Sequence, residues 1–259
     1  MIVDLHNHTT RCNHATGSMQ EYVQMAIKNG IKIFGFSDHA PMEFDKKWRM
    51  GFSQMADYES EAKILKERFK ADIEVLLGYE VDYLRGLIDE RVLKAEVDYL
   101  IGSVHFLGKW GFDNPEFIGE YQNRNIDAIW QEYFGAIEDM AKSGLFDIVG
   151  HIDLLKVFKF MPKKDVRILA KNALKAIKKA GLVVEINAAG FRKMVAEQYP
   201  SLPLLQEIYA LDIPITFGSD AHAVEQVGAG GAECERIARQ VGYLKCSVFK
   251  GRDMDSIKF

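Results

Sequence analysis

The sequence predicts an α/β fold in which parallel strands close into a barrel. Apolar strand-like segments alternate with amphipathic helical segments along the chain, giving seven strand–helix units, a pattern typical of a parallel sheet wrapped by helices. Neither GxGxxG nor GxxxxGK[ST] follows the first strand, which disfavours an open nucleotide-binding sheet. A chain of 259 residues without a low-complexity linker suits one such barrel. Residues 1–259 are therefore expected to form a single domain.

The seven strands are expected where apolar runs end in polar or charged residues. They lie at 1–8, 31–37, 74–82, 99–105, 146–151, 182–187 and 213–222, with a closing strand around Cys246–Phe249. Side chains alternate between the faces of an extended strand. Asp4, His6 and His8 are therefore expected to point to one face of the first strand.

Helices are expected between the strands. Ser18 and Glu21 form a capping box, which predicts a helix that begins there and ends at Gly30. Further helices are expected at 56–70, 87–96, 126–143, from Pro162 to Gly181, at 202–211 and at 232–241. A loop rich in aromatic and charged residues covers 42–53, and a long loop covers 106–125.

Composition restricts the classes of partner. The net charge is −4 and no basic patch is present, so a nucleic-acid partner is not expected. No apolar run approaches the roughly 20 residues that cross a bilayer, and because the first strand begins at once, no signal peptide is expected. The cysteines Cys12, Cys234 and Cys246 form no CxxC pair. No disulfide framework is expected, and a cytoplasmic location fits.

All seven histidines lie at or just beyond the ends of predicted strands, and none lies in a predicted helix. They are His6, His8, His14, His39, His105, His151 and His222. In a strand–helix barrel the carboxyl ends of the strands meet on one face, where active sites are built. Glu80 and Asp220 end strands on that same face. Any one of these histidines alone would more often be an ordinary hydrogen-bonded residue, but their shared position indicates a common site.

So many titrating groups at one barrel mouth predict bound metal. Without cations they would repel one another or lose hydration at a cost in free energy. Nine side chains, at about three protein ligands per ion, permit three divalent ions with open positions for water or substrate. The imidazole and carboxylate ligands suit Zn, Mn or Fe(II). Closely spaced divalent ions suit the hydrolysis of phosphate esters.

These residues resemble the motifs of the PHP (polymerase and histidinol phosphatase) superfamily. The similar segments are His6-Asn7-His8 with His14, Ser37-Asp38-His39, Gly78-Tyr79-Glu80, Gly102-Ser103-Val104-His105, Gly150-His151 and Ser219-Asp220-Ala221-His222. Segments 101–106, 110–116 and 186–193 resemble the histidinol-phosphate phosphatase branch. The resemblance covers nearly the whole chain and implies a distorted, TIM-barrel-like (β/α)7 barrel.

The resemblance also implies how three ions would be held. One ion would be bound by His6, His8, Glu80 and Asp220. Glu80 would bridge to a second ion, bound also by His105 and His151. The third would be bound by His14, His39 and His222. The implied activity is hydrolysis of L-histidinol phosphate to L-histidinol and phosphate in histidine biosynthesis, by attack of a metal-bound hydroxide.

Other residues are candidates for binding this small phosphomonoester. Arg192, just after the sixth strand, is predicted to clamp the phosphate because its planar fork matches phosphate oxygens. Lys156 and Lys159 are weaker candidates. Asp113 and Glu116 are predicted to face the ammonium and imidazole groups of the substrate. Trp110 and Phe112 are predicted to pack against its ring.

Two further roles are expected of acidic residues. Asp4 and Asp38 are predicted to orient metal-binding imidazoles from behind. Either Asp220 or a metal-bound water would protonate the leaving group, and the sequence does not choose between them.

Three other functions remain open at this point. The chain could be a different PHP phosphoesterase, such as a nucleotide phosphatase or an exonuclease, although a basic groove is missing. It could be a non-catalytic PHP module that metal stabilises. It could also be a metallohydrolase of C–N bonds, although that class typically uses a bridging lysine where this chain has Glu80. The oligomeric state is not predicted.

Overall fold

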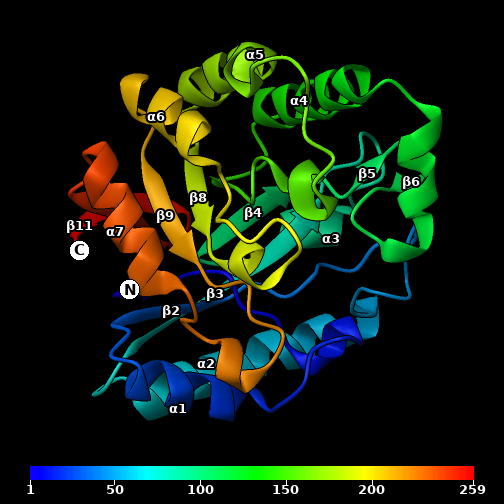
Figure 1. Cartoon of the computed structure of the whole chain (residues 1–259). Coiled ribbons are helices and arrows are strands. Elements are labelled where there is room, and N and C mark those ends of the chain that lie inside the picture. Colours follow the sequence, from blue (N-terminus) through cyan, green and yellow to red (C-terminus); the bar gives the residue numbers. More distant parts are fainter.

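Seven parallel strands form the central sheet of the computed structural model, which describes residues 1–259 (Figure 1). In spatial order they are β1 (Val3–Asp4), β2 (Ile33–Phe36), β3 (Glu74–Asp82), β4 (Tyr99–Ser103), β7 (Ile148–Val149), β8 (Val183–Asn187) and β9 (Ile215–Gly218). Backbone bonds also join the two ends of this row: Leu5 N donates to Phe217 O (2.9 Å) and Asp220 N donates to His6 O (2.7 Å). The sheet is therefore nearly closed, and the predicted α/β barrel is confirmed.

Helices surround this sheet, with α4 and α5 on one side and α1 and α2 on the opposite side (Figure 1). Their bounds are α1 (Met19–Lys28), α2 (Met55–Phe69), α3 (Glu90–Leu93), α4 (Ile126–Lys142), α5 (Val166–Ala180), α6 (Leu202–Ala210) and α7 (Gly231–Val241). The capping box at the start of α1 is present, since Glu21 N donates to Ser18 Oγ and Ser18 N to Glu21 Oε2. No helix combines the length and the apolar character that crossing a membrane requires.

Two segments differ from the predicted elements. Helix α3 is four residues long instead of spanning 87–96, because the Asp89 side chain accepts from Arg91 N (2.9 Å) and places the helix start there. The loop 106–125 contains a hairpin of β5 (Phe106–Leu107) and β6 (Trp110–Gly111), followed by the 3₁₀ helix η3 (Pro115–Asn123).

The predicted closing strand does not join the barrel. It forms β10 (Lys245–Lys250), which pairs antiparallel with β11 (Asp253–Lys258). At their turn, Arg252 Nε donates to Asp147 Oδ2 (2.8 Å) and Arg252 N donates to Asp98 O (2.8 Å). Asp147 precedes β7 and Asp98 precedes β4. The hairpin therefore covers the amino end of the barrel, opposite the end where the histidines lie.

Tyr99 links strands across the barrel interior. Its hydroxyl donates to Leu5 O (2.6 Å) and also lies 3.2 Å from Phe36 O. The tyrosine fits because residue 35 is glycine: a Cβ there would lie 2.0 Å from the Tyr99 hydroxyl oxygen. A real Cβ does not tolerate so short a contact, so any larger residue at 35 must displace the tyrosine.

We predict opposite stability changes for two Gly-to-Ala variants. Gly35→Ala should lower the free energy of unfolding by about 1–3 kcal/mol because it overpacks the barrel interior. Gly135→Ala should raise it by about 0.5–1 kcal/mol, because Gly135 lies within α4 with open space where a Cβ would be. Urea denaturation of the two variants and the wild type measures both changes. A Gly35→Ala protein as stable as the wild type would contradict the packing described for Tyr99.

Candidate metal centre

The structure brings all nine predicted metal-binding residues to the carboxyl end of the barrel. They come from the ends of β1, β2, β3, β4, β7 and β9 and from the loop after β1. Glu80, on β3, lies at the centre of the group. Its two carboxylate oxygens lie close to five imidazoles: His39 Nδ1 (2.8 Å), His151 Nε2 (2.9 Å), His6 Nε2 (3.5 Å), His105 Nε2 (3.5 Å) and His8 Nε2 (3.7 Å).

Asp220 and His14 also belong to the group, and both lie near His222. Asp220 Oδ1 lies 3.1 Å from His8 Nε2 and 3.5 Å from His222 Nδ1. The His14 ring is exposed and lies 4.6 Å from the His222 ring and 5.3 Å from the His39 ring, centroid to centroid. The nine residues therefore form one continuous cluster.

Ligand atoms within this cluster gather in threes. In three groups made only of predicted ligands they lie within 4.8 Å of one another: His6, His8 and Glu80; Glu80, His105 and His151; and His14, His39 and His222. His8 and His222 form a fourth group with Cys12. The three groups of predicted ligands parallel the three-ion arrangement that the family resemblance implied. Which ion each side chain holds stays a prediction.

The donor atoms fit divalent cations. Buried nitrogens without a hydrogen-bond partner include His6 Nε2 and His151 Nδ1. A buried polar atom without a partner costs free energy, and a bound cation removes that cost for a neutral imidazole. Imidazole and carboxylate donors together suit Zn, Mn or Fe(II).

The pKa values in the cluster are displaced in opposite directions. Burial alone lowers the pKa of an imidazole, and for His39 and His222 it dominates, so their pKa values lie well below the ordinary value. For His6, burial is outweighed by neighbouring carboxylates, Glu185 first, and the pKa rises well above the ordinary value. Burial would raise the pKa of Glu80, but the surrounding histidines hold it well below its usual range. A buried negative charge therefore sits among nitrogen donors, which is the combination that cations bind.

Glu185 is a functional residue that the sequence reasoning missed. It is buried on β8, and its Oε1 lies 2.6 Å from His6 Nδ1. Its Oε2 accepts from the backbone N–H of His151 (2.9 Å). A carboxylate behind a metal-binding imidazole fixes the tautomer and the orientation of the ring. The available signal was one acid in the apolar run of residues 182–186.

Asp82 has the same function for His105. Asp82 Oδ1 lies 2.7 Å from His105 Nδ1. Arg49 donates to both carboxylate oxygens of Asp82, from Nε (2.5 Å) and Nη2 (2.8 Å). Burial alone would lower the pKa of His105, but the charges of Asp82 and Glu80 outweigh it and raise that pKa to about 9. Because Arg49 belongs to loop 42–53, this pair also fastens the loop to the metal-binding residues.

The two aspartates predicted to orient imidazoles differ. Asp38 Oδ1 lies 3.4 Å from His8 Nδ1, a position compatible with the predicted role. Asp4 contacts no histidine ring, so its predicted role is wrong. Its carboxylate accepts from Ser219 N (2.8 Å) and Gly228 N (3.1 Å) instead. These backbone N–H groups belong to the segment between β9 and α7, and they bind the Asp4 carboxylate in place of an imidazole.

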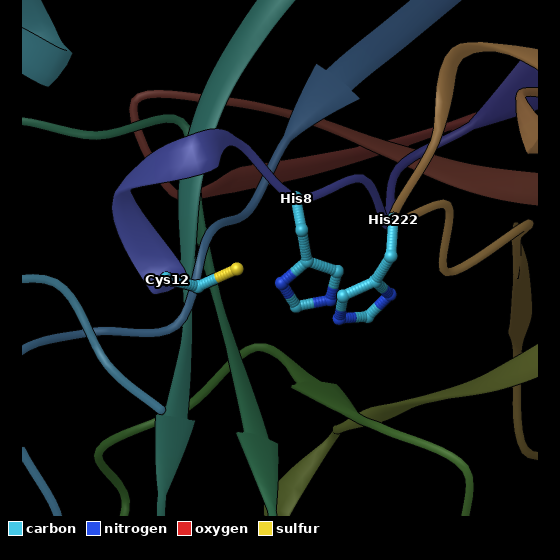
Figure 2. Close-up of side chains that lie close together, drawn as sticks. All are labelled: His8, Cys12 and His222. Carbon is cyan, nitrogen blue, oxygen red and sulfur yellow. The ribbon is translucent and has the colours of Figure 1, made fainter. Parts of the chain in front are cut away.

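Cys12 also lies beside His8, as Figure 2 shows. It comes from the 3₁₀ helix η1 (Thr10–Cys12), and its sulfur points toward the side of the His8 ring that faces away from Glu80 and Asp220. The thiol donates to Thr9 O (3.1 Å). Burial, followed by the charge of Asp38, raises the pKa of the Cys12 thiol. The sulfur packs beside His8, and the ligand atoms of Cys12, His8 and His222 lie within 4.8 Å of one another.

A cavity of about 690 Å³ opens above the cluster. Arg192, Asp113 and Glu116 all line it, as a role in substrate binding requires. Lys159 does not line it: this residue ends the 3₁₀ helix η4 (Leu154–Phe158) in a left-handed conformation and is exposed outside the cavity. The predicted substrate contact by Lys159 is therefore wrong. Lys156 is also excluded, since its ammonium group is buried against Glu197 and Asp153.

The aromatic wall of the cavity differs from the predicted one. Phe112 is buried and packs edge-to-face on Tyr133 at 5.3 Å, and Trp110 packs on Tyr121 at 4.7 Å. Neither lines the cavity. The aromatic side chains that do are Phe44, Trp48, Phe106, Phe117 and Tyr199. The hairpin β5–β6 turns Trp110 and Phe112 toward α4 and η3, which the sequence pattern of a loop does not reveal.

A nearly closed parallel barrel with histidines and carboxylates at the carboxyl ends of its strands defines a metal-dependent hydrolase of the TIM-barrel-like class. The family model for the PHP domain matches residues 4–189. The chain belongs to the PHP family.

Relatives and solved structures agree with this assignment. A Deinococcus radiodurans protein named "Probable histidinol-phosphatase" is 41% identical, over 93% of this chain and 94% of its own length. The histidinol-phosphatase of Bacillus subtilis is 30% identical, over 87% of this chain and 95% of its own. A Lactococcus lactis histidinol phosphate phosphatase, solved with Zn, L-histidinol and phosphate, has a TM-score of 0.82 at 23% identity and covers 98% of each chain. That last similarity supports the fold.

We predict that Glu185→Gln weakens metal binding by about 10- to 100-fold, because the amide cannot hold the His6 ring as the carboxylate does. Competition with a chromogenic chelator measures the affinity of the purified protein for Zn²⁺. Glu74→Gln is the matched control, because Glu74 is exposed at the opposite end of β3. Equal affinities in the wild type and both variants would contradict the proposed role of Glu185.

Proposed function

We propose that this protein is a metal-dependent phosphatase that hydrolyses L-histidinol phosphate to L-histidinol and phosphate. The observation that carries the proposal is the cluster of seven imidazoles and two carboxylates beneath a cavity that Arg192 lines. The names of its relatives give the substrate, since proteins named as histidinol-phosphatases match nearly the whole chain. The reaction belongs to histidine biosynthesis, and the buried free cysteines fit a cytoplasmic enzyme.

Three divalent ions, Zn, Mn or Fe(II), are proposed to occupy the three groups of ligand atoms. When bound, such ions would polarise the phosphoryl group and lower the pKa of a bound water to about 7. The residues of the chain hold the ligands in position: Glu185 and Asp82 fix the rings of His6 and His105. The Arg49 charge keeps the pKa of Asp82 well below its usual range in spite of burial, so Asp82 remains an acceptor for His105.

Arg192 is proposed to bind the phosphoryl oxygens. One of its guanidinium nitrogens, Nη2, donates to Ser219 O (2.7 Å) and Asp220 O (3.0 Å). These bonds hold the planar group against the strand end that carries Asp220. The remaining N–H groups are free to form charge-assisted bonds with a phosphate in the cavity.

The walls of the cavity suit the organic part of the substrate. Histidinol carries an ammonium group and an imidazole. Asp113 and Glu116 supply negative charge at the wall, and Phe106 and Trp48 supply apolar surface for a ring. The proton for the leaving alkoxide would come from Asp220, which lines the cavity, or from a water that one of the ions would hold.

The substrate is tested by comparing steady-state turnover of L-histidinol phosphate, other phosphomonoesters and short oligonucleotides. L-Histidinol phosphate should have the highest kcat/KM, and oligonucleotides should not be cleaved. Removal of metal by a chelator should abolish turnover, and Zn²⁺ or Mn²⁺ should restore it, because the ions supply the electrophilic charge. Preferred cleavage of oligonucleotides would assign the chain to the nuclease members of its family. Metal-independent turnover would overturn the proposed chemistry.

Arg192→Ala should lower kcat/KM for L-histidinol phosphate at least about tenfold, because a charge-assisted bond to phosphate is lost. Lys159→Ala is the matched control: it also removes an exposed cation, but one outside the cavity, and its kcat/KM should equal that of the wild type. Metal content and melting temperature of both variants show whether the centre and the fold are intact. Equal activity of the Arg192→Ala variant and the wild type would contradict phosphate binding by Arg192.

A further inference from the structure

Tyr199 lines the cavity together with residues already assigned to the site. The chain after β8 folds back so that Tyr199 pairs antiparallel with Asn187: Asn187 N donates to Tyr199 O (2.7 Å) and Tyr199 N donates to Asn187 O (3.0 Å). The Tyr199 ring meets His151 edge-on, with centroids 6.3 Å apart. Tyr199, Arg192 and Asp220 line the same cavity.

The hydroxyl of Tyr199 is buried and has no hydrogen-bond partner. Most other buried tyrosines donate to a fixed acceptor: Tyr58 to Gly78 O, Tyr99 to Leu5 O, Tyr121 to Phe112 O and Tyr243 to Ile213 O. Only Tyr22 and Tyr199 have a buried hydroxyl without a partner. Of these two, only Tyr199 lines the cavity.

Lys156 packs against the Tyr199 ring and is bonded to the segment that precedes it. The Lys156 ammonium group lies 5.1 Å from the centroid of the Tyr199 ring. Lys156 is itself held by Glu197 Oε1 (2.8 Å) and by Gln198 O (2.7 Å), on the segment that precedes the tyrosine. A fixed, desolvated donor beside a cavity is arranged to bind an acceptor that enters the cavity.

We propose that Tyr199 is a further catalytic residue, whose hydroxyl donates a hydrogen bond to a phosphoryl oxygen of the substrate. This inference rests on the proposed phosphatase function. Phosphoryl oxygens only accept hydrogen bonds, and the phenol of Tyr199 has its donor free. Tyr199 and Arg192 then supply donors to the phosphate from one wall of the cavity, while the metal-binding residues lie beneath it. The unpaired hydroxyl of the free enzyme becomes paired when substrate binds.

Tyr199→Phe removes only the hydroxyl oxygen and tests this inference. Tyr22→Phe is the matched control, because it removes a second buried, unpartnered hydroxyl that lies in α1 and outside the cavity. Binding of inorganic phosphate to the metal-loaded proteins is measured by isothermal titration calorimetry, together with kcat/KM for L-histidinol phosphate. Tyr199→Phe should weaken phosphate binding and lower kcat/KM by about tenfold or more. Tyr22→Phe should leave both unchanged.

Metal content and melting temperature separate substrate contact from a structural role. Both variants should keep the wild-type metal content and melt no lower than the wild type, since neither loses a hydrogen bond of the free protein. Wild-type phosphate affinity in Tyr199→Phe, or a loss of metal from it, would overturn the inference about Tyr199 and leave the phosphatase function standing. A wild-type protein that neither binds phosphate nor hydrolyses phosphomonoesters would overturn both.

Discussion

The burial of Glu80 among five imidazoles is the constraint on which the site depends. A carboxylate removed from water needs compensating charge or hydrogen bonds. Those five rings come from four different strand ends, so only a nearly closed barrel can bring them to one carboxylate. The backbone bonds between β1 and β9 are therefore part of the site as well as of the fold, because they set His6 and His8 beside Asp220.

Charged residues around the cluster hold the imidazoles near Glu80 in place. Glu185 and Asp82 each form a hydrogen bond with the Nδ1 atom of an imidazole, His6 and His105 respectively. Arg49, from the loop after β2, forms an ion pair with Asp82. An imidazole with its outer nitrogen bonded has one orientation and one tautomer. Cation binding then needs little rearrangement of the rings. The free energy of folding of the barrel offsets the free-energy cost of bringing so many imidazoles together.

Much of the fold and of the metal centre could be predicted from the sequence, because both rest on periodic patterns and strand ends. The span of β3 and the capping box of α1 follow from local residues alone. Contacts between distant segments could not be predicted in this way. The docking of the β10–β11 hairpin through Arg252 onto Asp147 and Asp98 joins residues far apart in the sequence, and so do the bonds from the backbone N–H groups of Ser219 and Gly228 to Asp4.

The proposed metal-binding residues and the proposed substrate-binding residues come from different parts of the fold. The metal-binding residues are fixed by the register of the sheet, since most of them end a barrel strand, and a shift of one residue would turn them away. Asp113, Glu116, Arg192 and Tyr199 instead lie in segments that follow β6 or β8 and wall the cavity. Loops tolerate change better than strands do. On the proposed function, the strand ends of this barrel hold the metal centre, and these segments supply the side chains that meet the substrate.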